Sequence, residues 1–339
     1  VSFSSPGVNA SILTTNPALN LRDTDMEAAT AGPLRLEFTR SFSDRLGLMA
    51  TDTVQEGKVW GNNIGANNWH SYNIHLVTTD YTPPASVGFM DSIGNVNYYD
   101  YSHDSGGMNV YAANTDNAET WETSVSLERD STTGKFTMVL PDGMTYTFSA
   151  ASADADRRAR LESIEDALGN ALTLCYDGAN NVGKLTKVSA PTGDPHHLHF
   201  YYSGYQITKV ELRNASSALL TTEYEYAVYN HPDYGNLHEL TKVTDNAGAT
   251  VQYGYETPAG NTKLRYIDEI TNKAGETTQF TRTLKSTAFG MLAYKIAVDD
   301  AAGLTTEYDT DPSTFVSTVS CYDSTTLLRK TVFRPGPSW

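Results

Sequence analysis

Cysteine is scarce in this sequence, and long hydrophobic runs are missing. The 339 residues include two cysteines, Cys175 and Cys321, far apart in the chain. Two cysteines define no disulfide framework. Both lie in strand-like runs, which favours buried thiols over a disulfide and leaves the redox compartment open. No hydrophobic run reaches the length of a membrane span, so we expect none.

Basic residues are also few. The chain has 24 Lys and Arg against 40 Asp and Glu, a net charge of −16 at pH 7. An acidic surface repels nucleic acid and anionic lipid, and no basic stripe reverses this locally. We therefore expect no nucleic-acid partner, and we expect anionic polysaccharides to bind only if a small basic pocket forms.

The usual catalytic signatures are absent as well. The sequence has no G-x-S-x-G elbow, no H-E-x-x-H helix motif, no phosphate-binding loop and no dinucleotide fingerprint. We therefore expect no catalytic residue, no cofactor and no metal. Paired carboxylates for glycoside chemistry stay open, because among 40 acidic residues some pair lies close by chance.

The second half of the chain contains an internal repeat. Five segments align on an apolar residue before a turn: LESIEDALG at 161–169, LTKVSAPTG at 185–193, LTKVTDNAG at 240–248, IDEITNKAG at 267–275 and YKIAVDDAAG at 294–303. A glycine follows this apolar anchor by five positions in each segment, and in four of the five an Asp or Asn follows it by two. A further copy, ITKVELRNASS at 207–217, lacks the glycine.

This spacing predicts tight hairpin turns. Asp or Asn at the first turn position caps the turn through its side chain, and Gly at the fourth adopts the left-handed conformation that closes the hairpin. The predicted structural turn residues are Asp166, Gly169, Gly193, Asp245, Gly248, Asn272, Gly275, Asp300 and Gly303. After each turn apolar and polar residues alternate, as at Val251, Tyr253 and Tyr255, which is typical of a strand.

These patterns predict an all-β fold of antiparallel hairpins that form a curled, extended sheet. The composition of 153–168 also suits a helix, but a strand at 160–166 fits the repeat. We divide the chain into an N-terminal β region, 1–152, and a hairpin array, 153–339. The first region has strand-like runs without regular spacing, and it includes a hairpin with Pro141-Asp142-Gly143 as its turn.

Histidine and acidic clusters are candidate metal sites. His197 and His199 of an HHxH run would share one strand face and could chelate zinc, but no third ligand can be named. The alternative is a polar strand surface beside a turn. Acidic clusters at 154–156, 299–300 and 309–311 match no known calcium loop, and we interpret them as turn caps and solvated faces.

Aromatic residues are candidate sugar-stacking sites. Trp121 lies in the polar stretch NAETWETS, and it is the tryptophan that we expect to be exposed. An exposed ring on a sheet can stack on a sugar ring, so Trp121 is a candidate ligand-binding residue. For Trp60, Trp69 and the many tyrosines, filling the buried face of the sheet is the simpler expectation.

The repeat resembles the YD repeat of Rhs proteins, a family that includes wall-associated bacterial proteins, insecticidal toxin-complex shells and teneurins. Four N-terminal segments are similar to the opening segments of Rhs proteins: NPALNLRDTDMEAATAGPLRLEFTRSF at 16–42, WGNNIGANNWHSYNIHL at 60–76, GFMDSIGNVNYYDY at 88–101 and LPDGMTYTF at 140–148. The family's Tyr-Asp-Pro…Gly-Arg-Phe signature is absent, and YDTDPST at 308–314 only echoes it. A self-cleaving aspartyl segment and a C-terminal toxin domain are absent too.

The resemblance implies a structural role. It suggests a non-enzymatic shell or scaffold fragment of a secreted or cell-surface bacterial protein, acting in toxin encapsulation or delivery, or in adhesion. Its expected partners are further YD repeats or a C-terminal toxin domain of a longer parent chain. The chain begins at Val1 without a visible signal peptide, so we expect a processed chain or a segment of a longer one. The alternatives are a carbohydrate-binding or adhesion module with glycan as partner, and a glycan-active enzyme on a β scaffold.

Overall fold

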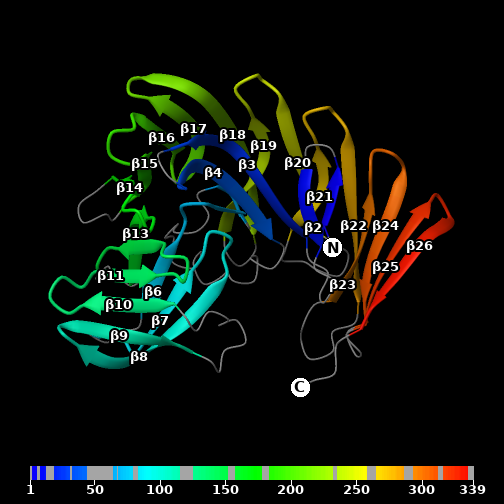
Figure 1. Cartoon of the computed structure of the whole chain (residues 1–339). Helices are drawn as coiled ribbons and strands as arrows, with labels where there is room; N and C mark the ends of the chain where they lie inside the picture. The colour runs from blue at the N-terminus through cyan, green and yellow to red at the C-terminus, as the bar shows by residue number, and fades with distance from the viewer. Residues whose placement is uncertain are drawn as a thin grey trace. The chain divides into compact units, whose positions relative to one another are not determined.

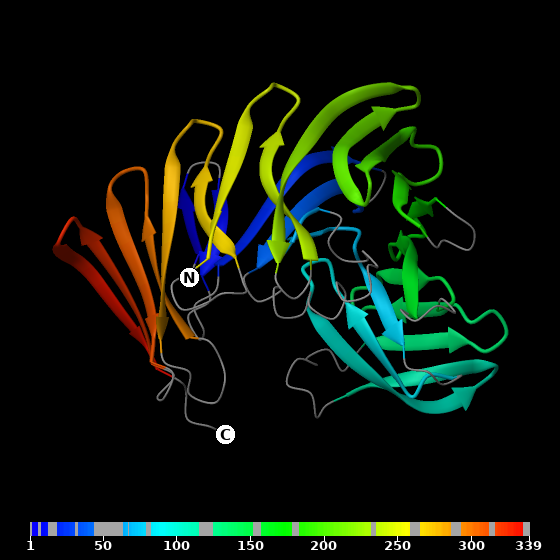
Figure 2. The same cartoon turned by 180° about the vertical axis from the view of Figure 1, so that it is seen from behind.

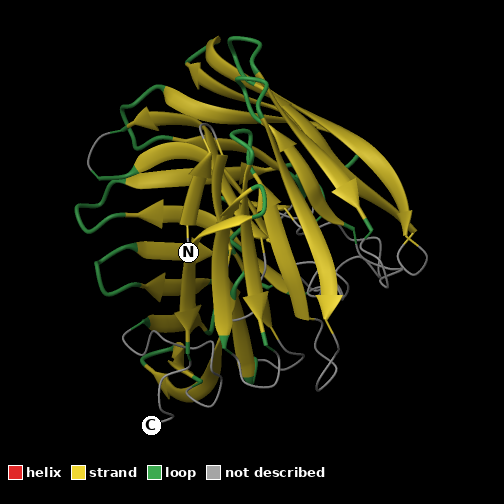
Figure 3. Cartoon of the chain, turned by 90° about the vertical axis from the view of Figure 1, so that its right-hand side faces the viewer, coloured by secondary structure: helices red, strands yellow, loops and turns green. Residues whose placement is uncertain are grey.

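The computed structural model describes residues 2–5, 8–12, 19–30, 33–43, 64–66, 68–78, 83–114, 125–151, 157–177, 183–231, 235–257, 265–285, 293–311 and 316–334. The regular secondary structure in these ranges consists of β-strands, and no helix occurs in them (Figure 3). The all-β prediction is therefore confirmed, and the segment at 160–166 lies in strand β13 (Arg158–Glu165) up to its last residue. No helix long and apolar enough to cross a membrane occurs among the described residues.

Five strands form a first sheet in the order β1-β2-β3-β4-β5. They are β1 (Ser2–Ser5), β2 (Val8–Ile12), β3 (Leu19–Ala29), β4 (Arg35–Ser43) and β5 (Asn68–His70). Strand β4 buries consecutive residues from Phe38 to Phe42, so both of its faces are covered. A strand with two buried faces loses the simple alternation of apolar and polar residues.

The other strands run from β6 to β26. They are β6 (His75–Thr78), β7 (Ser86–Met90), β8 (Val96–Ser105), β9 (Met108–Ala113), β10 (Ser126–Asp130), β11 (Phe136–Val139), β12 (Thr145–Phe148), β13, β14 (Ala171–Tyr176), β15 (Leu185–Ser189), β16 (His196–Ser203), β17 (Gln206–Asn214), β18 (Ser217–His231), β19 (Gly235–Thr244), β20 (Thr250–Glu256), β21 (Tyr266–Thr271), β22 (Thr277–Lys285), β23 (Ala293–Asp299), β24 (Leu304–Thr310), β25 (Ser317–Asp323) and β26 (Thr326–Phe333).

Residue contacts divide the chain into two compact units. The first comprises 1–23, 40–68 and 223–339, and the second comprises 24–39 and 69–222. The boundary predicted near 152 falls inside the second unit, between β12 and β13, which are paired antiparallel. The boundary predicted from the start of the sequence repeat therefore differs from the boundaries given by residue contacts.

Within the second unit, strands β6 to β13 close a ring. Each strand pairs antiparallel with the next, and β13 pairs back onto β6. The first half of β13 makes this closure, with Arg158 opposite Val77 and Arg160 opposite His75. Its second half pairs with β14 from Ser163 onward. Strand β13 is therefore the branch point between the ring and the hairpins that follow.

The buried face of the ring is filled by large side chains. Its fully buried members include Leu76, Tyr99, Leu127, Phe136, Met138 and Phe148. Phe89 of β7 lies edge-on to Phe148 of β12, with ring centroids 6.4 Å apart. The ring centroids of Tyr111 of β9 and Phe136 of β11 lie 6.2 Å apart. Because these rings come from strands far apart in the chain, their packing stabilises the closure as well as each hairpin.

From β13 onward, consecutive strands pair antiparallel with one another. Figure 1 shows the last of them, β22 to β26, as orange and red hairpins, and Figure 2 shows the same hairpins from behind. One face is apolar and buried, as at Val251 and Phe280. The residues one position away, Gln252 and Gln279, are exposed. The period-two pattern predicted from the sequence is therefore the pattern of burial.

Candidate functional site

The predicted turn residues build a repeated hairpin turn. At the first copy, the backbone N–H of Gly169 donates to the carbonyl oxygen of Asp166 at 3.0 Å. One carboxylate oxygen of Asp166 accepts from the N–H groups of Leu168 at 2.8 Å and Asn170 at 2.9 Å. Gly169 has a φ of 84°, a conformation that glycine adopts without a Cβ clash. The Asp side chain thus satisfies two backbone donors within the chain reversal.

The same arrangement recurs at Asp245, Asn272 and Asp300. In each copy the side-chain oxygen accepts from the N–H groups two and four residues later, at 2.9 to 3.0 Å. The closing glycines have φ values of 81° to 82°, and they are Gly248, Gly275 and Gly303. Gly193, with a φ of 94°, lies in a different turn, in which Asp194 N–H donates to Pro191 O at 3.0 Å.

A further copy of this turn lies in the N-terminal region. Asp91 accepts from the N–H groups of Ile93 and Asn95 at 2.9 Å each, and Gly94 has a φ of 84°. The segment 88–101 is identified from the sequence only by its similarity to an opening segment of Rhs proteins, and its turn is not predicted there as a copy of the repeat. The signal is present, because Asp91 and Gly94 follow Phe89 by two and five positions.

Replacing Asp300 by Ala is expected to lower the free energy of unfolding by about 1 kcal/mol, because two backbone N–H groups lose their acceptor. Asp300→Asn is the matched control, since Asn272 occupies the same position in a neighbouring copy and makes the same bonds. Urea denaturation measures both variants. Equal losses for Ala and Asn would contradict the capping role.

Tyrosines at β-bulges form a second repeated device, which the sequence analysis missed. The strand register shifts immediately before five tyrosines: Tyr176, Tyr202, Tyr226, Tyr255 and Tyr322. The signal in the sequence is that each of the first four ends an alternating run with tyrosine instead of phenylalanine. Tyrosine differs from phenylalanine by its hydroxyl, which can donate a hydrogen bond.

Three of these hydroxyls donate to a main-chain carbonyl oxygen on the strand that precedes their own. The pairs are Tyr176 to Leu161 at 2.9 Å, Tyr202 to Leu185 at 2.8 Å and Tyr255 to Leu240 at 2.9 Å. Each acceptor leucine itself lies at a register shift, opposite Phe148, Tyr176 and Tyr226 respectively. A bulge disrupts the ladder, and the tyrosine of a later strand supplies a donor at that point.

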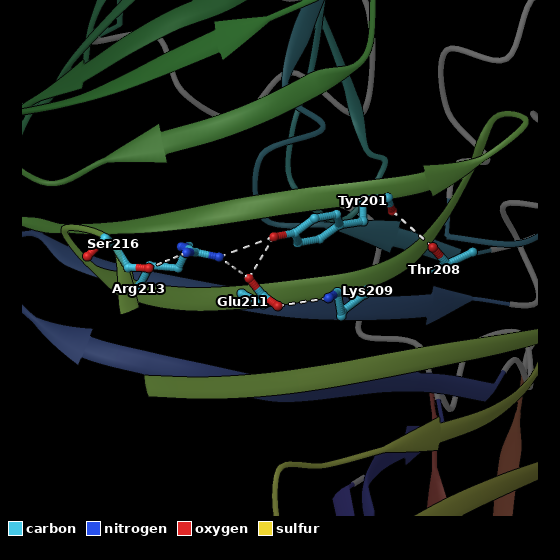
Figure 4. Close-up of polar contacts among 6 residues, drawn as sticks. All are labelled: Tyr201, Thr208, Lys209, Glu211, Arg213 and Ser216. Atoms are coloured by element: carbon cyan, nitrogen blue, oxygen red, sulfur yellow. Dashed lines mark hydrogen bonds and ion pairs between the residues drawn. The ribbon is translucent and has the colours of Figure 1, made fainter. Parts of the chain in front are cut away.

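The polar face of the β16–β17 hairpin carries a charged cluster around Glu211 (Figure 4). The Glu211 carboxylate accepts from Lys209 Nζ at 2.8 Å, from Tyr201 Oη at 2.7 Å and from Arg213 Nη1 at 2.5 Å. Arg213 also donates to the Tyr201 hydroxyl at 3.2 Å and to the carbonyl oxygen of Ser216 at 2.5 Å. The Lys209 ammonium lies 4.1 Å from the centroid of the Tyr201 ring.

These contacts keep Glu211 ionised although it is buried. Burial alone would raise its pKa, but the hydrogen bonds from Lys209, Tyr201 and Arg213 outweigh burial and lower the pKa to about 2. The hydrogen bond to Glu211 in turn raises the pKa of Tyr201, so its hydroxyl stays protonated as a donor. Both cations of the cluster, Lys209 and Arg213, therefore donate to the same carboxylate, that of Glu211.

His197 and His199 lie beside this cluster, on the same face. His199 is opposite Glu211 on one side and Lys187 on the other, and His197 is opposite Arg213. Burial lowers the pKa of both histidines, and the nearby Lys187 and Arg213 lower it further. Within the described part of the chain, no three His, Cys, Asp or Glu side chains are placed to hold a metal. The zinc hypothesis therefore gains no third ligand there.

Both cysteines are free, and the expectation of two buried thiols is wrong. Cys175 is exposed and Cys321 is partly exposed. On β14 the alternation buries Leu172 and Leu174, so Cys175 points to the polar face, opposite Lys187. The apolar neighbours of Cys175 in the sequence lie on the opposite face of the strand.

The tryptophan proposed as a ligand contact, Trp121, lies outside the described residues, as do Trp60 and the acidic cluster at 154–156. Trp69 is buried, and its Nε1 donates to the carbonyl oxygen of Asn73 at 3.0 Å. Trp69 therefore serves the core, as expected for most aromatic residues of this chain.

Comparison with known proteins gives a likeness in fold alone. No family model and no curated protein matches the chain. A crystal structure of TcdB2-TccC3 is similar over 97% of this chain, with a TM-score of 0.47 and 11% sequence identity. The chain covers 20% of that larger chain. A similarity of this size does not show a family.

Proposed function

We propose that the chain is a non-enzymatic structural scaffold of the Rhs/YD kind, part of a shell that encloses or presents a cargo. The observation that carries this proposal is that carboxylate and hydroxyl side chains repeatedly form hydrogen bonds to the backbone. The turn carboxylates cap backbone N–H groups, and three bulge tyrosines donate to carbonyl oxygens. Side chains committed in this way to the backbone are not available for substrate chemistry.

The mechanism is steric. Antiparallel hairpins joined by short turns form a continuous wall, in which each unit is stabilised by its neighbours. In this proposal the partner is a toxin domain or further YD repeats of a longer parent chain, at the cell surface or in the secreted state. The sequence resemblance to Rhs proteins supports this assignment of partners.

The full-length reading frame gives the first test. The proposal expects further YD repeats and a C-terminal domain after Trp339, and a frame without either would contradict it. The second test is protection. The following domain, expressed in its parent chain, should resist proteinase K at least tenfold longer than the same domain expressed alone. Equal cleavage rates would contradict the shell. The matched control is the parent chain carrying Tyr176→Phe, Tyr202→Phe and Tyr255→Phe, in which protection should be shortened.

A further inference from the structure

The third residue of the repeated Asp turn differs between the two compact units of the chain. In each of the five copies its backbone N–H donates to the side-chain oxygen of the first turn residue, at 2.8 to 2.9 Å. The three copies in the first unit have alanine at this position: Ala247, Ala274 and Ala302. The two copies in the second unit have Ile93, which is 39% exposed, and Leu168, which is 79% exposed. Because alanine is sufficient for the turn, the turn itself does not explain these two exposed apolar side chains.

The turn that contains Ile93 lies close to the turn between β11 and β12. Phe89, near the end of β7, stacks on Tyr146 of β12 with ring centroids 6.4 Å apart. Burial raises the pKa of Tyr146, and the nearby carboxylates of Asp142 and Asp91 raise it further. Asp142 belongs to the β11–β12 turn and Asp91 to the β7–β8 turn, so both turns lie beside the same ring.

The turn that contains Leu168 lies beside the same β11–β12 turn. A Cβ atom placed on Gly143 would lie only 2.9 Å from the Cβ atom of Ala167, so the two turns are close neighbours. The pairing of strands β6 to β13 into a ring thus brings together three turns that are distant in the sequence. We call their exposed apolar residues the tip cluster, which consists of Ile93, Pro141 and Leu168.

The segments that form the tip cluster are acidic. Segments 88–98, 139–146 and 163–172 contain no Lys, Arg or His. Two of their carboxylates, those of Asp142 and Glu165, belong to exposed residues. The complete set of carboxylates in these segments is Asp91, Asp142, Glu165 and Asp166. The tip cluster therefore combines an apolar surface with a local negative charge.

In the first unit, a lysine compensates the charge of one of the turns. Lys273, the second residue of the β21–β22 turn, bonds Asp245 of the β19–β20 turn at 2.7 Å. The second turn residue in the two copies of the second unit is Ser92 or Ala167, and neither carries a charge. A cation of a partner can therefore take the place at these turns that Lys273 takes at Asp245.

The negative charge disfavours two other occupants of the tip cluster. A second copy of the chain would bring the same carboxylates together, and like charges across an interface repel. A lipid bilayer would accept the apolar side chains, but insertion would also remove the neighbouring carboxylates from water, which is costly. A protein segment that is both cationic and apolar can cover the apolar residues and pair with the carboxylates.

From the exposed apolar turn residues, their clustering and the local carboxylates, we infer that the tip cluster binds a cationic, amphipathic segment of another protein. The apolar residues of this segment pack on Ile93 and Leu168, and its lysines or arginines bond Asp142 and Glu165. An apolar centre with charged pairs at its rim is the usual organisation of a protein interface. This inference stands apart from the scaffold proposal, because it concerns three turns and requires no enclosed cargo.

The test uses the full chain and three labelled peptides in fluorescence anisotropy. They are Lys-Leu-Leu-Lys-Lys-Leu-Leu-Lys, its counterpart with Glu for Lys, and its counterpart with Ser for Leu. The Lys–Leu peptide should bind at least tenfold more tightly than either counterpart, and raised salt should weaken its binding. A chain with Ile93→Ala and Leu168→Ala, which has the turn residue of the first unit, should bind it at least tenfold more weakly while its thermal unfolding stays unchanged.

Two further chains separate the tip cluster from the rest of the protein. Ala302→Leu places a leucine at the same turn position of the first unit and should leave the affinity unchanged. Asp142→Asn combined with Glu165→Gln removes two charges but keeps an acceptor for the Met144 N–H, which bonds Asp142 at 3.0 Å. This chain should bind the Lys–Leu and Glu–Leu peptides within threefold of each other. It tests the inference even if the double alanine chain does not fold.

Four results would overturn the inference. The first is a lack of binding by the Lys–Leu peptide, and the second is equal binding by the Lys–Ser peptide, which would mean that charge alone suffices. The third is a dimer, measured by sedimentation, that disappears in the Ile93→Ala and Leu168→Ala chain and would assign the tip cluster to a second copy. The fourth is flotation with phosphatidylcholine vesicles that the same chain loses, which would assign the tip cluster to a membrane.

Discussion

Replacing Tyr255 by Phe is expected to lower the free energy of unfolding by about 1–3 kcal/mol, although the change removes a single oxygen atom. The Tyr255 hydroxyl donates to the carbonyl oxygen of Leu240 at 2.9 Å, and Leu240 is buried at a register shift of the ladder. Without the hydroxyl, the carbonyl oxygen of this buried residue loses its side-chain donor. A buried acceptor left without a donor costs more than the bond itself contributes.

Tyr205→Phe is the matched control for this prediction. Tyr205 is 57% exposed, and the described residues give its hydroxyl no partner, so its loss should change stability by no more than about 0.5 kcal/mol. Urea denaturation gives the comparison, and amide exchange around Leu240 shows whether the opening is local. A loss for Tyr255→Phe no larger than that for Tyr205→Phe would show that the bulge carbonyl does not need its donor.

The hairpin turns could be predicted because their chemistry is local. An Asp, its two N–H partners and the closing glycine lie within five residues, so composition and spacing are sufficient. The tyrosine bonds span 15 to 17 residues, and they depend on which strand precedes which and where the register shifts. The tyrosines are visible in the sequence, but their acceptors are not.

Two further features lie on opposite sides of this limit. The sequence Lys209-Val-Glu-Leu-Arg213 alternates charged and apolar residues, so a strand there places Lys209, Glu211 and Arg213 on one face. The charged cluster could therefore be predicted from the sequence, although the segment was interpreted only as a copy of the repeat that lacks the glycine. The pairing of β13 with β6 could not be predicted from the sequence, because it joins residues about 80 positions apart through backbone hydrogen bonds.

Replacing Glu211 by Gln is expected to cost about 2 kcal/mol at pH 7 and to flatten the loss of stability in acid. The folded pKa of Glu211 is about 2, below its ordinary value of 4.5. A carboxyl with a lowered folded pKa stabilises the protein above its ordinary pKa, and this contribution is lost as the pH falls toward the folded pKa. In the Gln variant Lys209 and Arg213 lose their shared anion at every pH.

The difference between the native chain and the Gln variant isolates Glu211 from the other acidic residues. That difference should be largest above pH 5 and should shrink toward zero near pH 2, measured by urea denaturation at each pH. Glu225→Gln is the matched control, because Glu225 also pairs with a lysine, Lys242, but its side chain is 61% exposed. An exposed pair contributes at most about 1 kcal/mol, so this variant should stay close to the native curve. A Glu211 difference that does not change with pH would mean that its ionised form is not what the cluster stabilises.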